Sequence, residues 1–244
     1  MKRFIALAII VSFAFVSVVA QPADEKPKTV TETLYILPKR GMEDKFEAGV
    51  KAHNQKFHPD GPNRAGLRKV EYGEKAGWYV WVFGPTTYAA LDSRPGKANG
   101  HDEDWSKMVD PFVDQYGDVM LWEFNSDLSY GADILKNSKY YEAWAIDLKR
   151  GEYYRFKAMI EKMKKVYESK ATKGFLIFEN PIHTTNSPDV AILWSFNSYD
   201  EWSKDMGVKD DYEKMFGAGT WQLLLNEWKD ISVNYSSEIR SMIK

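Results

Sequence analysis

The chain has 244 residues and a formal net charge of −2, so it carries no basic excess for binding nucleic-acid phosphates. It contains no cysteine, which excludes disulfide frameworks, thiolate metal sites, iron–sulfur clusters and cysteine nucleophiles. Hydrophobic residues make up 44% of the chain and aromatic residues 15%, enough for a large core, so disorder is excluded for most of the sequence.

The first twenty residues have the pattern of a cleavable signal peptide. A Lys-Arg pair precedes an apolar run at 4–16, and Val18 and Ala20 occupy the −3 and −1 positions of a cleavage site. The apolar run is shorter than the ~20 residues that span a bilayer, and no basic cluster follows it. We therefore expect a periplasmic or secreted protein that starts at Gln21 and has no stable membrane insertion.

The first half of the mature chain alternates strand and helix patterns. Its first helical segment has an apolar stripe at steps of three and four residues that includes Phe46, Val50 and His53. Pro111 predicts a kink or a restart in its second helical segment. The predicted elements are a strand at 30–37, a helix at 42–57, strands at 65–73 and 78–83, a helical turn at 88–91, a helix at 102–116 and a strand at 119–124.

The second half repeats this order after an offset of about 110 residues. The matching pairs are Lys39-Arg40-Gly41 with Lys149-Arg150-Gly151, Glu32 with Glu142, Phe46 with Phe156, Val50 with Ile160, and Trp81 with Trp194. The predicted elements are strands at 140–148, 174–179, 189–196 and 229–235, and helices at 152–168 and 209–225. An ordered series of matches in the same context indicates an internal duplication.

These patterns predict an α+β fold. Each half has the βαββαβ order of a ferredoxin-like unit, and its strands are apolar on both faces, as in Trp78 to Phe83. Helices would cover one face, and the other half would cover the second. We therefore expect two ferredoxin-like βαββαβ repeats packed sheet to sheet as a pseudo-dimeric α+β barrel. The predicted segments are a signal peptide (1–20), a flexible leader (21–29), a first repeat (30–126), a connector (127–138), a second repeat (139–236) and a C-terminal tail (237–244).

The openings of the two halves carry a family resemblance. The stretch Tyr35-x-x-Pro38-x-x-Gly41 and the stretch from Tyr141-Glu142 to Gly151 each lead from a strand through a tight turn into a long helix. In this respect the chain resembles the antibiotic-biosynthesis-monooxygenase, EthD and NIPSNAP superfamily of dimeric α+β barrels, over roughly residues 30 to 236. The resemblance implies the fold and transfers no catalytic residue.

Histidines and aromatic rings of the first half are the candidate site residues. His53 lies on the helix stripe where the second half has Met163, so it is either a packed core histidine or a group that binds a ligand, metal or haem. The predicted pocket comprises His53, Asn54, Tyr79, Trp81, Trp105 and His101. His53, His58 and His101 could converge on a transition metal, since imidazole ligands at loop ends are typical of such sites. Their spacing matches no ligand motif, however, so we predict no metal site and no cofactor. The acidic run Asp102-Glu103-Asp104 is interpreted as favourable charge at a helix start.

Charged side chains also interrupt the predicted strands. Charges on strands usually face water, but in a two-sheet barrel one set would point inward and orient the polar end of a bound molecule. The residues concerned are Glu32, Arg68, Glu71, Glu123, Glu142 and Glu179.

Two functional interpretations stay open, and whether the protein is an enzyme stays open with them. The chain lacks GxSxG, P-loop, GxGxxG and HExxH motifs, which removes most common enzyme classes. The first interpretation is an exported protein that binds a small apolar or aromatic molecule in a barrel cavity. The alternative is an oxidoreductase, either of the cofactor-independent monooxygenase kind or dependent on haem, as in chlorite-dismutase-like members of the superfamily. We favour binding because no acid–base constellation stands out. We expect the pocket in the first half, because that half carries His53 where the second half has Met163.

Overall fold

The computed structural model describes residues 27–135, 138–170, 173–184 and 187–243, and the expected signal peptide lies outside them. The first half comprises β1 (Thr29–Pro38), α1 (Glu43–Phe57), β2 (Ala65–Tyr72), β3 (Tyr79–Thr87), α2 (Tyr88–Leu91), η1 (Lys97–Asn99), α3 (His101–Met108), η2 (Asp110–Phe112) and β4 (Val113–Tyr130). The second half comprises α4 (Ala132–Leu135), β5 (Tyr140–Leu148), α5 (Tyr153–Lys170), β6 (Phe175–Glu179), β7 (Val190–Phe196), α6 (Tyr199–Trp202), α7 (Val208–Phe216), α8 (Thr220–Ile231) and β8 (Ser232–Ile243).

The eight strands form a closed antiparallel barrel in the order β1-β3-β2-β8-β5-β7-β6-β4. Two long strands close it. Strand β4 pairs with β1 along its first part and with β6 from Glu123 onward, and β8 pairs with β5 and then, at its end, with β2. The mixed α+β fold with a barrel agrees with the sequence prediction. Among the described residues, no helix has the length and apolar character needed to cross a membrane.

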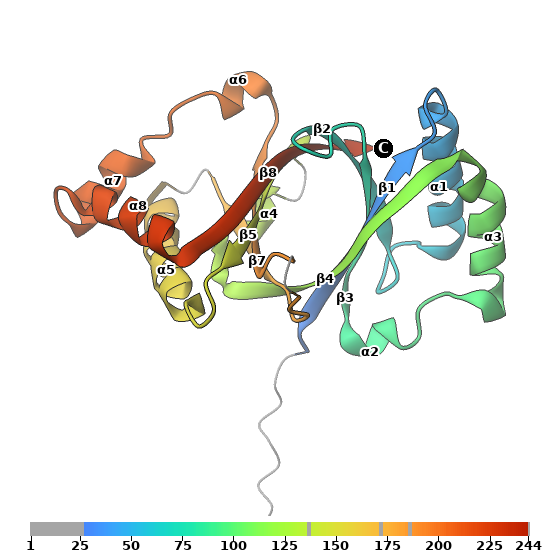
Figure 1. Ribbon diagram of the computed structural model, residues 1–244, viewed down its shortest axis with the longest axis horizontal. Helices are drawn as coiled ribbons and strands as arrows, with labels where there is room; N and C mark the ends of the chain where they lie inside the picture. Colours follow the sequence, from blue (N-terminus) through green and yellow to red (C-terminus); the bar gives the residue numbers. More distant parts are fainter. Residues whose placement is uncertain (1–26, 136–137, 171–172, 185–186, 244) are drawn as a thin grey trace, which may run out of the picture.

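The helices lie outside the barrel in two groups on opposite sides (Figure 1). Helices α1 and α3 cover strands β1, β2 and β3, and helices α5, α7 and α8 cover strands β5, β6 and β7. The strands alternate as expected, since Tyr79, Trp81 and Phe83 pack in the helix-side core, whereas Val80 and Val82 pack on the other face. The cores therefore lie between helices and barrel wall.

The face of the sheet opposite the helices carries a polar network. The Tyr35 hydroxyl donates to Glu238 Oε1 (2.7 Å) and accepts from Arg240 Nη2 (2.8 Å), while Arg240 Nε donates to the same carboxylate (2.5 Å). Nearby, the Arg68 guanidinium lies 4.2 Å from the centroid of the Tyr141 ring. Of the predicted strand charges, Arg68 is thus the one that packs inside, and the barrel interior is filled by paired charges as well as apolar side chains.

The second predicted helix of the first half is shorter than expected. Helix α3 ends at Met108 and a 3-10 turn contains Pro111, so the chain restarts as predicted, but as strand β4 from Val113. Proline has no backbone N–H for a helical bond and disfavours helix in the residue before it. The strand predicted at 119–124 is therefore the middle of an 18-residue strand.

The C-terminal region also differs from the expectation. The helix predicted at 209–225 is divided into α7 and α8 by Gly217 and Gly219, whose φ angles are 110° and 79°. Residues 237–243, expected as a tail, continue β8 and hydrogen-bond to β5 and β2. They extend a strand whose inward side chains, Glu238 and Arg240, form an ion pair with each other.

Both halves enter their first long helix through the same turn. Met42 N–H donates to Lys39 O (2.9 Å), and Glu152 N–H donates to Lys149 O (3.0 Å). Gly41 and Gly151 have φ angles of 77° and 85°, a region that glycine enters without a steric penalty. The 110-residue offset between the two Lys-Arg-Gly sequences therefore joins structurally matching positions.

The strand register changes one of the predicted matches. Trp81 lies opposite Leu34, and Trp144, 110 residues after Leu34, lies opposite Ile192. Ile192 is therefore the counterpart of Trp81, and the match of Trp81 with Trp194 was wrong by two residues. The match rested on the shared Trp-x-Phe pattern of 81–83 and 194–196, which could not fix the register because the loops before it differ in length.

Helix α3 packs closely on α1 at Gly49. A Cβ atom at this buried position would overlap the Met108 carbonyl oxygen. One turn further along, His53 faces Asp104 of α3. The missing side chain therefore lets the two helices approach and positions the side chains between them.

We expect Gly49→Ala to lower the free energy of unfolding by about 1–3 kcal/mol, the usual cost of overpacking, although alanine favours helix. Gly66→Ala is the control, because no heavy atom lies within 4 Å of a Cβ built there and its φ is not positive. Urea denaturation of both variants measures the difference. A Gly49→Ala protein as stable as the parent would contradict the close packing of α1 on α3.

Candidate functional site

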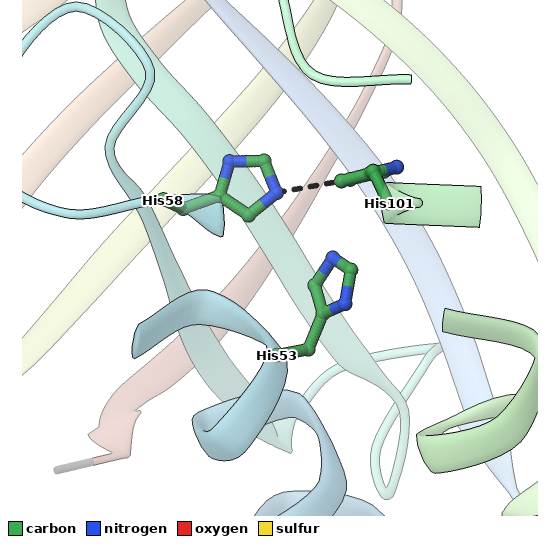
Figure 2. A group of neighbouring side chains, drawn as sticks. All are labelled: His53, His58 and His101. Atoms are coloured by element: carbon green, nitrogen blue, oxygen red, sulfur yellow. Dashed lines mark hydrogen bonds between the residues drawn. The ribbon is translucent and has the colours of Figure 1, made fainter. Parts of the chain in front are cut away.

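Three histidines form a compact cluster between α1 and α3 (Figure 2). His53 lies on α1, His58 is the C-cap residue directly after α1, and His101 is the first residue of α3. One ring nitrogen from each lies within 4.8 Å of the other two. His53 is fully buried, His58 is 6% exposed, and the His101 ring is 18% exposed. The cluster therefore reaches the surface through His101.

Local backbone structure fixes these positions. His58 is the C-cap of α1, where its backbone N–H donates to Asn54 O (2.8 Å). His101 follows Gly100, whose φ of 80° starts α3. The long sequence separation between the ends of the two helices is the reason why residue spacing did not predict the cluster.

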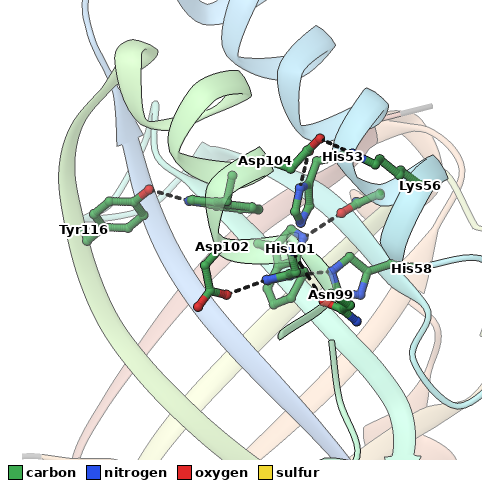
Figure 3. Close-up of polar contacts among 11 residues, drawn as sticks. His53, Lys56, His58, Asn99, His101, Asp102, Asp104 and Tyr116 are labelled. Atoms are coloured by element: carbon green, nitrogen blue, oxygen red, sulfur yellow. Dashed lines mark hydrogen bonds and ion pairs between the residues drawn. The ribbon is translucent and has the colours of Figure 1, made fainter. Parts of the chain in front are cut away.

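The outer nitrogen of each ring is held by an oxygen atom, and Figure 3 shows this contact for His53 and His101. The pairs are His53 Nδ1 with Asp104 Oδ1 (2.8 Å), His58 Nδ1 with the Asn63 carbonyl oxygen (2.7 Å), and His101 Nδ1 with Asp102 Oδ1 (2.9 Å). Asp104 also accepts from Lys56 Nζ (2.8 Å). The acidic start of α3 thus holds two of the three rings, in addition to its favourable position at a helix N-terminus.

The inner nitrogens face one another. His58 Nε2 and His101 Nε2 are 3.1 Å apart, and His53 Nε2 is buried with no hydrogen-bond partner among the described residues. Converging imidazole nitrogens are the arrangement that could hold a metal ion.

Burial controls the protonation of the cluster. It lowers the pKa of His53 and lowers the pKa of His58 to about 4, against the partial compensation of their oxygen partners. For Asp104, partial burial acts to raise the pKa, but hydrogen bonds from Lys56 and His53 hold it below its usual value. His58 is therefore a neutral imidazole at pH 7.

Aromatic rings surround the cluster. His53 lies 5.0 Å from Phe57 and 4.9 Å from Trp105 between ring centroids, and His58 lies 5.2 Å from Trp81. The indole N–H of Trp81 donates to Asn54 Oδ1 (3.0 Å), and that of Trp105 donates to the Tyr116 hydroxyl (2.7 Å). Because these polar atoms are bonded elsewhere, the indoles contribute mainly apolar surface to the cluster.

The structure thus brings most of the predicted pocket residues together. His53, Asn54, Trp81, Trp105 and His101 surround one point, and His58 joins them. Tyr79 belongs to the same core, but its hydroxyl donates to Glu47 Oε1 (2.5 Å) and its ring packs on Phe46. Whether these residues bind a ligand stays a prediction.

A cavity of about 430 Å³ lies in the second half, between the outer face of the barrel and the covering helices. Its walls contain five of the nine tryptophans together with methionine, leucine, isoleucine and phenylalanine side chains. The tryptophans are Trp144, Trp194, Trp202, Trp221 and Trp228. Sequence reasoning expected the pocket in the first half and missed this cavity. The tryptophans gave no signal, because four lie before residue 140 and five after it.

A few polar groups stand among these apolar walls. Both carboxylate oxygens of Glu142 accept indole N–H bonds, Oε1 from Trp144 and Oε2 from Trp202, each at 2.8 Å. Lys173 forms an ion pair with Glu201, whose pKa is lowered chiefly by that hydrogen bond. Glu142, predicted as a strand carboxylate, therefore lies at the cavity.

We expect the stability of the metal-free protein to fall as pH decreases from about 6.5 to 4. Burial lowers the pKa of His58 to about 4. In this pH range the unfolded chain therefore binds a proton at His58 that the folded protein does not bind, which favours unfolding as the pH falls. The loss attributable to this residue is on the order of 3 kcal/mol at pH 4. Urea denaturation across this range, with a chelator present, should show a shallower pH dependence for His58→Gln than for the parent. The exposed His183→Gln variant is the control, and equal slopes for the parent and His58→Gln would contradict the assignment.

Comparison with known proteins finds similarity at the level of structure. No family model and no curated protein sequence matches the chain. A candidate monooxygenase from Fusobacterium nucleatum has a TM-score of 0.57 at 10% identity, covering 90% of this chain and 94% of its own. An anthrone oxidase-like protein has a TM-score of 0.54 at 8% identity, and a chlorite dismutase variant from Candidatus Nitrospira defluvii has 0.55 at 8%, each covering 90% of this chain and 93% of its own. The chain therefore has the dimeric α+β barrel fold that its strand–turn–helix openings predicted.

Proposed function

We propose that this protein binds a small apolar or aromatic molecule in the cavity of its second half. The observation that carries the proposal is a cavity of about 430 Å³ with five tryptophans in its walls. Ligand pockets are typically ~300–1,000 Å³ and mostly apolar with a few placed polar groups. The volume is about three times the ~150 Å³ that holds benzene in a protein core, which suits a molecule of two or three rings.

The charged lining groups narrow the ligand class. Glu142 and Glu201 contribute two carboxylates and Lys173 a single cation, which is paired with Glu201. An anionic ligand would therefore meet unfavourable charge, whereas a neutral or weakly basic aromatic molecule would not. Stacking on indole faces favours such rings, particularly cationic ones.

The alternative function is oxidation of an aromatic substrate in the same cavity. The names of the structural neighbours favour it, but their identity of about 10% supports the fold and not the chemistry. A cofactor-independent monooxygenase needs a base near its substrate. Glu142 has both oxygens occupied by indole N–H groups, and His53 belongs to the other half of the fold. Binding without chemistry is therefore the better-supported function.

Haem fits neither site. No histidine lines the cavity, and the carboxylates of Glu142 and Glu201 would oppose the haem propionates. In the histidine cluster, ring centroids 4.6–5.4 Å from His53 occupy the space that a flat macrocycle would need.

Two further properties complete the proposal. The halves are repeats of one βαββαβ unit in a pseudo-dimeric barrel, a view that the shared Lys-Arg-Gly turns and the common strand order of the halves support. The protein is exported to the periplasm or beyond the cell, as the signal-peptide pattern of residues 1–20 indicates.

We expect Met163→Trp to abolish binding of the neutral fluorescent probe N-phenyl-1-naphthylamine, because the indole would fill the cavity that Met163 lines. The parent should bind the probe with increased fluorescence, and the affinity of the variant should be at least tenfold lower. Met215→Trp is the matched control, since Met215 is 42% exposed on α7 and is not among the lining residues. If a folded Met163→Trp protein binds the probe as tightly as the parent, the cavity is not the binding site.

Export makes a separate prediction. Mass spectrometry of the protein recovered outside the cytoplasm should give the mass of a chain that begins at Gln21. A retained Met1 or Lys2 would contradict cleavage after Ala20.

A further inference from the structure

We propose that His53, His58 and His101 bind one divalent first-row transition-metal ion, with zinc the first candidate. Three imidazole nitrogens would coordinate the ion, and a fourth position would be open to water or another small ligand. This site lies between α1 and α3 and is independent of the proposed ligand cavity in the second half.

The first argument is the direction of the ring protons. A backbone carbonyl oxygen can only accept, so His58 must carry its proton on Nδ1, which contacts the Asn63 oxygen. His101 Nδ1 faces a carboxylate and carries a proton for the same reason. In neutral rings the two Nε2 atoms are then both acceptors, yet they lie 3.1 Å apart. A cation between them would turn this repulsion into attraction.

The second argument is the buried nitrogen of His53. Its Nδ1 is taken by Asp104, and its Nε2 is buried without a hydrogen-bond partner among the described residues. Leaving such an atom unsatisfied is unfavourable, and most buried polar atoms find a partner. A metal ion among the three rings would satisfy it together with the Nε2 atoms of His58 and His101.

The third argument is the set of orienting oxygens. Histidines that bind metals almost always donate their other ring N–H to a carboxylate or a backbone carbonyl, which fixes the tautomer and the ring direction. Here Asp104, Asn63 and Asp102 supply that oxygen to all three rings. Any buried histidine needs a partner for its ring N–H. Here the three partners lie on the outer side of the cluster, so that the remaining nitrogens converge.

Distances and donor type indicate the class of ion. A tetrahedral zinc ion with Zn–N bonds of ~2.0–2.1 Å separates its nitrogen ligands by about 3.3 Å. The Nε2 atoms of His58 and His101 are 3.1 Å apart, which is close to this value. The ligand nitrogens of all three rings lie within 4.8 Å of one another, so a modest rotation of the rings would bring them to bonding distance of one ion. Three neutral nitrogens with an open fourth position are the donor set of catalytic zinc sites and exclude calcium and magnesium, which prefer oxygen. The partial exposure of His101 provides access for the fourth ligand.

The test uses the untagged mature protein beginning at Gln21, treated with a chelator, dialysed and titrated with Zn²⁺ and Co²⁺. We expect one equivalent of Zn²⁺ by elemental analysis and calorimetry, and a visible absorption band from four-coordinate Co²⁺. Asp102→Ala should weaken zinc binding by about 10–100-fold, since Asp102 only orients a ligand. His101→Gln should weaken it further. Added Zn²⁺ should raise the unfolding midpoint of the parent and not that of His101→Gln.

His183→Gln is the matched control. His183 Nδ1 also pairs with a carboxylate, Asp189 Oδ1 at 3.0 Å, but its side chain is 72% exposed and belongs to no histidine cluster among the described residues. This variant should bind zinc as the parent does. The proposal is overturned if the parent retains no stoichiometric Zn²⁺ or Co²⁺, or if His101→Gln binds as tightly as His183→Gln. Should His101→Gln fail to fold, unchanged affinity in Asp102→Ala, whose carboxylate is 60% exposed, would overturn it instead. Probe binding to the second-half cavity is measured separately, so either proposal can fail alone.

Discussion

Closure of the sheet by two long strands is the constraint on which the rest of the structure depends. Because β4 and β8 each pair with strands of both halves, every strand has two neighbours and the sheet has no free edge. Closure leaves one face of the sheet inside, where Tyr35, Glu238 and Arg240 satisfy one another. Both candidate sites therefore lie on the outer face, between the barrel wall and the helices.

The two sites occupy corresponding layers of the two halves. At the 110-residue offset, His53 and Phe57 of α1 correspond to Met163 and Tyr167 of α5, both of which line the cavity. Gly49, which admits α3 against α1, corresponds to Met159, which also lines the cavity. In the first half, Gly49 allows α3 to pack closely on α1. In the second half, the larger and flexible Met159 occupies the corresponding position on α5. The same layer is therefore packed with imidazoles in one half and left open in the other.

The fold was more accessible to sequence reasoning than the sites were. Helix stripes, strand alternation and the repeated Lys-Arg-Gly turn are local patterns, and they predicted the element order and the barrel. The histidine cluster depends on how closely α1 approaches α3, and that approach is possible because Gly49 has no side chain. No spacing rule in the sequence predicts such a contact. The cavity depends on how the side chains of α5 and α8 pack against the sheet. Unfilled volume is a property of packing, and the sequence lists only the side chains around it.

Comparison with the second half shows that the metal-free histidine cluster lowers the stability of the first half. Met163 and Tyr167 demonstrate that this layer of the fold tolerates side chains that leave no polar atom like His53 Nε2 unsatisfied. A buried polar atom without a partner typically costs ~1–3 kcal/mol. With both rings neutral and protonated on Nδ1, the Nε2 atoms of His58 and His101 would be two acceptors facing each other at 3.1 Å. Packing alone would favour an apolar substitute at position 53. Three histidines, each oriented by its own oxygen, are consistent with a layer whose stability is completed by a bound cation.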